Sequence, residues 1–263
     1  MRLHRIPTET ETLPTALPRN MPGGSTGVLL LHGFTGTPRD LADLGERLHA
    51  GGLAVSIPRL PGHGTNGRDF LQTGWRDWLR TAVDAFSDLR ARCATVHVIG
   101  FSMGGVLAVL LAARFAVGKL VLLAPALRAT NPLLPFSPLL SLFIRRVRWP
   151  VTSPVTVVDP DYAVQEREYW SWRYSAQAAS LLKIQRMARH ALHSVTADTL
   201  TLIGRRDRSV PLSVIRLLER GMSSARTRFR VFEKASHHIL AGEQGDLVVE
   251  EVLCWLAPRL AAR

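Results

Sequence analysis

The sequence is poor in cysteine and has no apolar run long enough to cross a membrane. Its 263 residues contain two cysteines, Cys93 and Cys254, which stand in no known motif. Two isolated cysteines favour free structural thiols over a disulfide framework. No apolar run approaches the ~20 residues that a membrane-spanning helix needs, and the N-terminal stretch lacks the apolar core of a secretory signal. These absences predict a cytoplasmic protein without stable membrane insertion.

Lysine is also scarce, although the net charge is +12 and basic residues number 33. Only three of these are lysines, and the arginines are scattered, with the densest group at Arg145, Arg146 and Arg148. Scattered arginine is more typical of a solvated surface than of a track for phosphates. The sequence has no zinc-ligand spacing, phosphate loop or RNA-binding signature. We therefore expect no nucleic-acid partner, no metal and no cofactor, while a weak preference for anionic surfaces stays open.

Short apolar runs alternate with amphipathic segments along most of the chain. Strands are expected at 27–33, 53–60, 95–100, 119–125, 198–204 and 227–234. Helices are expected at 38–50, 75–91, 103–115, 211–220 and 246–260. This alternation predicts an α/β fold with a mostly parallel central sheet flanked by helices. In such sheets, functional sites form at the carboxyl ends of the strands.

The alternation breaks between about residues 126 and 196. The break opens with Pro-rich segments ("NPLLPFSPLL"), and a long helix is expected around 162–192. We interpret the chain as a single domain of residues 1–263 with a helical insertion at about 126–196. For the rings of this insertion, we favour packing inside it over forming the wall of a substrate pocket; the rings are Trp149, Tyr162, Tyr169, Trp170, Trp172 and Tyr174.

The stretch "VIGFSMGG" at 98–105 indicates a serine nucleophile. Ser102 follows an apolar strand and precedes a helix, with Gly100 and Gly104 two residues to either side. A serine in such a strained strand-to-helix turn needs glycine neighbours because the backbone passes close by. The start of the helix also favours negative charge that develops nearby.

A serine hydroxyl needs a base to accept its proton, and the base needs an orienting acid. Asp207, in "LIGRRDRSVP", follows the carboxyl end of a predicted strand, whereas Asp198 stands at the amino end of the same strand. His237 and His238, in "KASHHIL", follow the next strand. The order of serine, aspartate and histidine is the one expected for a nucleophile on this turn. The residues alone leave the choice between the two histidines open.

A tetrahedral intermediate also needs backbone amides that donate to its oxyanion. The first expected donor is the N–H of Met103, which follows the nucleophile. The second should come from the loop after the first buried strand, "LHGFTGTP" at 31–38. Gly33 and Gly36 let this loop curl inward, and the N–H of Phe34 is our candidate.

These motifs resemble those of the α/β-hydrolase family. "LLLHGFTGTP", "LPGHGT", "GFSMGG" and "GRRDRSVP" are similar in order and rough spacing to those of bacterial carboxylesterases and monoacylglycerol lipases, over about residues 27–257. In that branch the base is the histidine of an S-x-H-x-[IL]-like run. The run fits Ser236, His238 and then Ile239–Leu240, so the resemblance implies that His238 is the base. It also implies that residues 126–196 form a cap over the site.

The sequence therefore predicts a serine carboxylic-ester hydrolase that acts through Ser102, His238 and Asp207, with small uncharged esters of short or medium acyl chains as substrates. One alternative keeps the fold and changes the bond, as in a C–C hydrolase, amidase, acyltransferase or cofactor-free peroxidase. Another is a non-catalytic binding protein on the same fold. The sequence does not indicate an oligomeric state.

Overall fold

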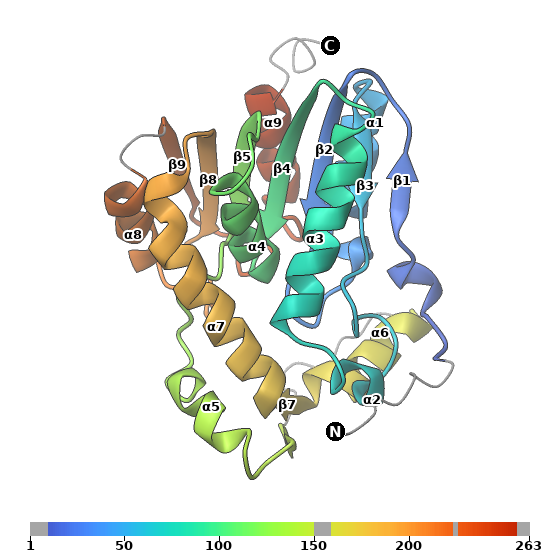
Figure 1. Ribbon diagram of the computed structural model, residues 1–263, viewed down its shortest axis with the longest axis vertical. Helices are drawn as coiled ribbons and strands as arrows, with labels where there is room; N and C mark the ends of the chain where they lie inside the picture. Colours follow the sequence, from blue (N-terminus) through green and yellow to red (C-terminus); the bar gives the residue numbers. More distant parts are fainter. Residues whose placement is uncertain (1–9, 150–158, 223–225, 257–263) are drawn as a thin grey trace.

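A computed structural model describes residues 10–149, 159–222 and 226–256, and a seven-stranded sheet forms the centre of this part of the chain (Figure 1). The strand order is β1-β3-β2-β4-β5-β8-β9, and all neighbours are parallel except the edge pair β1 and β3. The strands are β1 (Arg19–Met21), β2 (Thr26–Leu31), β3 (Ala54–Ile57), β4 (Thr95–Phe101), β5 (Lys119–Leu123), β8 (Asp198–Gly204) and β9 (Thr227–Phe232).

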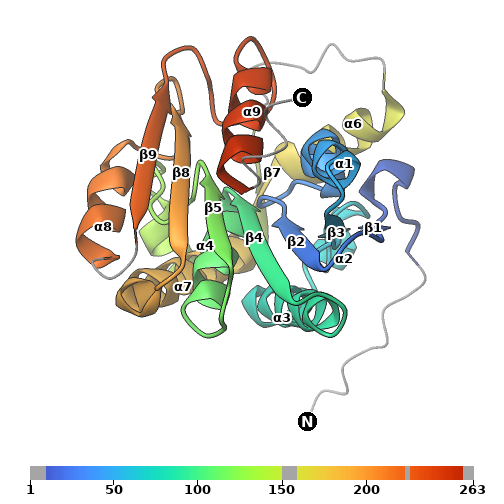
Figure 2. The same cartoon turned by 90° about the horizontal axis from the view of Figure 1, so that it is seen from above.

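Helices cover both faces of this sheet, as Figure 2 shows. On one face lie α1 (Ala42–Ala50) and α9 (Gly245–Leu256); on the other lie α3 (Trp75–Arg90), α4 (Met103–Ala112) and α8 (Ser213–Gly221). Successive residues of a strand point to opposite faces. Val28 and Leu30 of β2 accordingly pack with α1 and α9, whereas Leu29 and Leu31 pack with α3 and α4. The predicted α/β fold with a mostly parallel, doubly covered sheet is confirmed.

Most predicted boundaries agree within a few residues, and prolines explain some differences. The strand expected at 53–60 stops at Ile57, directly before Pro58, where the missing N–H ends the ladder. The helix expected at 38–50 begins with a 3-10 turn, η2 (Pro38–Leu41), before α1. The helix expected at 246–260 is seen as α9 up to Leu256, and 257–260 fall outside the described residues.

Between β5 and β8 the chain forms a separate layer of several short elements and one 17-residue helix, which we call the inserted segment (residues 126–196). Figure 1 shows it at the end of the sheet where the parallel strands finish. Its described elements are η3 (Leu134–Phe136), α5 (Ser137–Leu140), β6 (Arg146–Arg148), α6 (Pro160–Gln165), η4 (Glu166–Trp170), β7 (Trp172–Tyr174), α7 (Ser175–Ala191) and η5 (Leu192–Ser194). The short helix α2 (Gly67–Phe70) faces this layer, and Asn66 caps it.

The prediction of one long helix around 162–192 is wrong. α6 ends at Gln165, a π-helical turn follows at Glu166–Trp170, and the chain then extends as β7 before α7 begins. β7 pairs antiparallel with β6, with Tyr174 opposite Arg146. Pairing with a strand from elsewhere in the chain overrides the helical pattern of the local sequence.

Two tyrosines fix the inserted segment to the loop before α2. The Tyr169 hydroxyl donates to the Gly62 carbonyl at 2.9 Å and accepts from the Thr65 N–H at 2.9 Å. Its burial raises the pKa of Tyr169 to about 12. Tyr174 is also buried, and a Cβ on Gly67 would collide with its hydroxyl. Both rings are packed and buried, as expected, but in part against the loop before α2 and not only inside the inserted segment.

Three buried histidines, His32, His63 and His97, predict a pH-dependent stability, because burial lowers the pKa of each. Burial is the main cause that lowers the pKa values of His32 and His97 to about 4. Their stabilising contribution is therefore complete above their unfolded pKa of about 6.5 and is lost as the pH falls toward 4. We expect the free energy of unfolding to fall by about 1 kcal/mol for each histidine between about pH 7 and pH 5.5. Asp40 opposes part of this loss, because burial raises its pKa to about 6.

Denaturant unfolding at the two pH values measures this effect. His97→Gln should reduce the pH sensitivity by about 1 kcal/mol, whereas His190→Gln, at an exposed position of α7, should leave it unchanged. An equal pH sensitivity in the wild type and in His97→Gln would contradict the assignment.

Candidate active site

Ser102 occupies a strained turn between β4 and α4. Its φ of 52° and ψ of −113° lie outside the common regions for a residue with a side chain. The turn is held by the Ser102 N–H, which donates to the Leu123 carbonyl at 2.9 Å, and by the Ser102 carbonyl, which accepts from Ala126 at 3.0 Å. A Cβ on Gly104 would collide with the Leu31 carbonyl, and one on Gly100 with the backbone of Gly104. The predicted need for glycine clearance is confirmed.

Asp207 lies in the loop after β8, as expected, and both of its carboxylate oxygens have partners. Oδ1 accepts from the backbone N–H groups of Ser209 at 2.7 Å and Val210 at 2.9 Å. Oδ2 lies 2.8 Å from Nδ1 of His237. The Asp207 side chain is 1% exposed. The two amides fix the carboxylate in one orientation, so that its second oxygen is directed at the imidazole.

His237 completes the line to the serine. It follows β9, and its Nε2 lies 3.0 Å from Ser102 Oγ. A carboxylate can only accept, so we assign the ring proton to Nδ1, which leaves Nε2 to accept the serine proton. Three strands, β4, β8 and β9, thus bring one side chain each to the same edge of the sheet.

The choice of His238 from the S-x-H run is not supported by this geometry and is corrected to His237. The His238 side chain is exposed, and its ring lies beside the rings of Phe101 and His237, with centroids 5.6 and 5.8 Å away. Within the described residues it makes no hydrogen bond to Ser102 or Asp207. The physical reason is a tight turn, in which the Ile239 N–H donates to the His237 carbonyl at 2.9 Å while the Ile239 side chain is buried.

The two expected oxyanion donors flank Ser102. Met103 begins α4 directly after the serine, and a Cβ on Gly33, the residue before Phe34, would lie 3.3 Å from Ser102 Cβ. Neither the Phe34 N–H nor the Met103 N–H has an acceptor in the part of the chain that the structure describes. Free amides at the first turn of a helix and beside a nucleophile can stabilise a negative oxygen.

The loop that carries Phe34 is held firmly by packing. The Phe34 ring makes edge-to-face contacts with Phe70 and Trp78, with centroids 5.4 and 5.9 Å apart. Thr35 has a φ of 60°, and a Cβ on Gly36 would collide with the Asp40 carboxylate, which itself accepts from the Thr37 N–H at 3.0 Å. The sequence analysis identified the glycines of this loop but not Asp40, whose carboxylate accepts from the Thr37 N–H. The only sign of this contact in the sequence is that Asp40 stands three residues after Thr37, as in a capping box.

Comparison with known proteins agrees with this arrangement. The profile of the alpha/beta hydrolase family matches residues 28–251. The chain belongs to this family. It is 45% identical over 89 residues to the thermostable monoacylglycerol lipase of Bacillus sp. (strain H-257), a match that covers 34% of this chain and only 36% of that protein. It is 22% identical over 239 residues to the carboxylesterase of Bacillus subtilis (strain 168), covering 90% and 95% of the two chains.

A solved structure is also similar to this α/β hydrolase. That structure comes from work on LipS and LipT, two lipolytic enzymes derived from a metagenome. The two folds superpose with a TM-score of 0.83 at 28% sequence identity, and the match covers 93% of this chain and 98% of the other. The similarity therefore extends through the sheet and the inserted segment.

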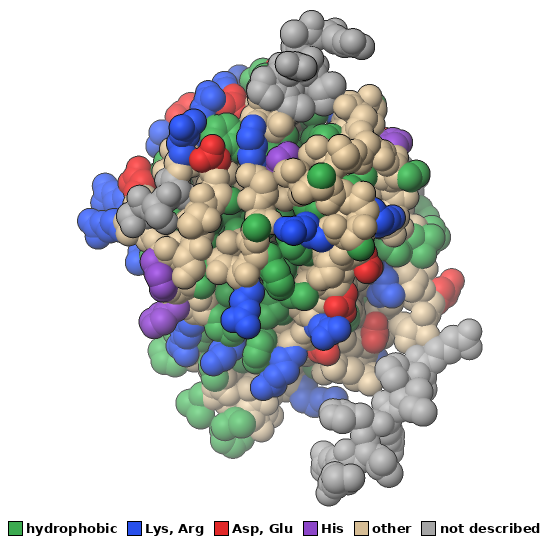
Figure 3. Space-filling view, turned by 45° about the horizontal axis from the view of Figure 1, so that its top comes forward, with side chains coloured by type: hydrophobic (Ala, Val, Ile, Leu, Met, Phe, Trp, Pro, Cys, Tyr) green, Lys and Arg blue, Asp and Glu red, His purple; other side chains and the backbone are tan. Residues whose placement is uncertain are grey.

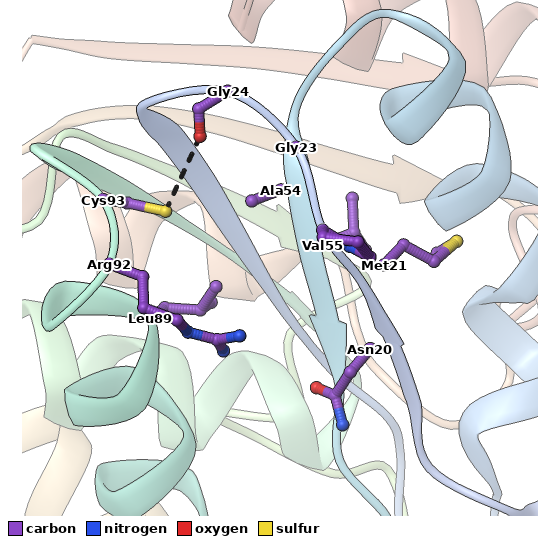
Figure 4. Close-up of a pocket in the computed structure, with 10 residues that line it drawn as sticks. Asn20, Met21, Gly23, Gly24, Ala54, Val55, Leu89, Arg92 and Cys93 are labelled. Atoms are coloured by element: carbon purple, nitrogen blue, oxygen red, sulfur yellow. Dashed lines mark hydrogen bonds between the residues drawn. The ribbon is translucent and has the colours of Figure 1, made fainter.

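Other features of the α/β hydrolase lie away from the serine. Among the described residues there is no group of His, Cys, Asp or Glu that could hold a metal ion, and no helix is long and apolar enough to span a membrane. Figure 4 shows a cavity lined by Asn20, Met21, Val55 and Cys93, among others. It lies near the amino ends of β2 and β4, opposite to the triad. Cys93 is buried there, and both cysteines are free, as expected.

Proposed function

We propose that this α/β hydrolase is a serine carboxylic-ester hydrolase in which Ser102 is the nucleophile, His237 the base and Asp207 the orienting acid. The observation that carries the proposal is the unbroken line of contacts from Asp207 Oδ2 through both nitrogens of His237 to Ser102 Oγ, at 2.8 and 3.0 Å. The relatives, which are named lipases and carboxylesterases, support an ester-hydrolysing enzyme.

The chemistry begins with the attack of Ser102 Oγ on the ester carbonyl carbon while His237 Nε2 takes the hydroxyl proton. Asp207, held by the amides of Ser209 and Val210, stabilises the imidazolium that forms. The tetrahedral intermediate collapses when His237 returns the proton to the alcohol oxygen, and the alcohol leaves. Water then attacks the acyl-serine with the same base, which releases the carboxylic acid and restores Ser102.

The backbone N–H groups of Phe34 and Met103 are the proposed donors to the oxyanion. Each is free of protein acceptors within the described residues, so no existing bond must break when the charge develops. One such donor typically contributes about 3–4 kcal/mol to the stabilisation of the transition state. No metal or other cofactor enters this mechanism.

The proposed substrates are small uncharged esters of short or medium acyl chains, with monoacylglycerols among them. The name of the Bacillus monoacylglycerol lipase supports this class. Ser102 is 8% exposed, and the inserted segment follows directly from β5 beside it. We propose that this segment acts as the cap that limits the length of the acyl chain.

Hydrolysis of p-nitrophenyl esters from acetate to palmitate tests the proposal. We expect turnover with an optimum at short or medium chains, and labelling of Ser102 by a fluorophosphonate. Labelling without turnover of any ester would contradict ester hydrolysis and indicate a different scissile bond. The absence of both turnover and labelling would contradict the assignment of Ser102 as an activated nucleophile and would favour a binding protein.

A further inference from the structure

The inserted segment exposes large apolar side chains on its outer surface. Phe143 is 82% exposed and Leu142 73%. We call the set to which they belong the outer apolar face, and it comprises Leu133, Phe136, Leu139, Leu142, Phe143 and Trp149. Elsewhere in the described residues, Leu17 and Leu247 are the exposed large apolar side chains outside residues 133–149. A concentrated patch of this kind marks an interaction surface.

The spacing shows that this face is a regular feature of the helical turn. Phe136 ends η3, Leu139 and Leu140 lie in α5, and Phe143 lies in the turn that follows; their spacing of three and four residues is the one that places side chains on one side of a helical segment. Ser137, which falls between them, is buried. The usual arrangement is therefore inverted, because the polar residue faces the protein and the apolar residues face outward.

Positive charge borders the apolar residues directly. Arg145, Arg146 and Arg148 are exposed, and within the described ranges none of them forms an ion pair. The sequence contains no acidic residue between Asp88 and Asp159. The stretch that carries the outer apolar face therefore contains basic residues and no acidic ones.

The position of this surface matches the direction from which a substrate would come. The inserted segment leaves the sheet at the carboxyl end of β5, next to Ser102, and Figure 1 places α5 at this end of the molecule. In Figure 3, hydrophobic side chains gather at the lower left of the molecule beside Lys and Arg side chains, toward the end where α5 lies.

We propose that the outer apolar face docks the protein on the surface of an anionic lipid bilayer. Leucine and phenylalanine side chains that protrude from a short helix enter the boundary between headgroups and acyl chains, while adjacent arginines contact lipid phosphates. A second copy of the chain fits less well, because an interface formed by this face would bring unpaired arginines of both copies together. Docking would place the inserted segment, and the serine behind it, against a source of lipid esters.

Flotation with lipid vesicles tests this docking. The wild type is expected to float with vesicles of equal parts phosphatidylcholine and phosphatidylglycerol, and much less with phosphatidylcholine alone or in high salt, which screens the arginines. Leu139→Ser/Leu142→Ser/Phe143→Ser should weaken the partition by about 100-fold or more. Arg145→Gln/Arg148→Gln should weaken it roughly 25-fold, since each basic residue near an anionic leaflet contributes about a factor of five.

Matched substitutions elsewhere on the surface provide the controls. Leu17→Ser/Leu247→Ser removes exposed leucines, and Arg216→Gln/Arg220→Gln removes exposed arginines of α8; both should float like the wild type. Thermal unfolding confirms that each variant is folded. Flotation that is absent in the wild type, or unchanged in either variant of the outer face, would overturn the proposal. So would light scattering that shows a dimer broken by the apolar variant, with no vesicle binding. The assay measures binding, so it is independent of the proposed ester hydrolysis.

Discussion

Ser102→Ala is expected to abolish ester hydrolysis and to leave the protein folded. The substitution removes the oxygen that lies 3.0 Å from His237 Nε2 and with it the only atom of the triad that can form the acyl bond. In a serine hydrolase the loss of the nucleophile reduces kcat by about 10⁶-fold. Alanine keeps the same backbone constraint at φ 52°, and the hydrogen bond between His237 and Asp207 does not involve the serine. The melting temperature should therefore stay close to that of the wild type.

The measurement is kcat on the preferred p-nitrophenyl ester, together with fluorophosphonate labelling. Ser213→Ala is the matched control, because Ser213 begins α8 and is exposed; it should keep its activity and its label. Near-full activity of Ser102→Ala in a purified, folded sample would exclude Ser102 as the nucleophile. It would also remove the main support for the proposed mechanism.

The sheet was predictable because its strands are buried on both faces. A strand such as β2, with its run of leucines between a glycine-rich start and the "HGFTG" loop, has the continuous apolar pattern of a strand buried on both faces. Ser102 and Asp207 were predictable for a related reason. Each depends on its place directly after a strand, and the carboxyl ends of parallel strands meet at one edge of the sheet.

The inserted segment was not predictable in the same way. Residues 162–192 have a helical composition, but Tyr169 and Tyr174 are held by contacts with Gly62, Thr65 and Gly67, far away in the sequence. The pairing of β7 with β6 is equally non-local. The periodicity of residues 162–192 carries no information about contacts with distant residues, and those contacts determine where the helix ends.

The choice between the adjacent His237 and His238 also depends on contacts that the local sequence does not show. Successive side chains of a loop point in different directions, and which one reaches Asp207 depends on the turn between Ala235 and Ile239. That turn is set by the burial of Ala235 and Ile239 and by the bond from the Arg206 N–H to the Ala235 carbonyl at 3.0 Å. Counting from Ser236 in the resembling motif selects His238, whereas the packed loop places His237 against the serine.

This difference leads to the second large expected effect. His237→Ala should reduce kcat by about 10³-fold or more, because it removes the group that accepts the Ser102 proton and returns it to the leaving alcohol. His238→Ala should change kcat only a few fold, because its exposed ring contacts Phe101 and His237 but neither Ser102 nor Asp207. The two variants are each other's control, since they remove the same side chain from neighbouring positions of one loop.

Kinetics on one ester, measured with both variants and with thermal unfolding as the check on folding, separates the assignments. A large loss of kcat confined to His238→Ala would show that His238, and not His237, faces Ser102 in the working enzyme. The base would then be the one that the S-x-H-x-[IL] resemblance implies. High activity in both variants would exclude a histidine base at this loop. A loss confined to His237→Ala is the outcome we expect, because the 2.8 and 3.0 Å contacts of its two nitrogens leave no room for a second imidazole between Asp207 and Ser102.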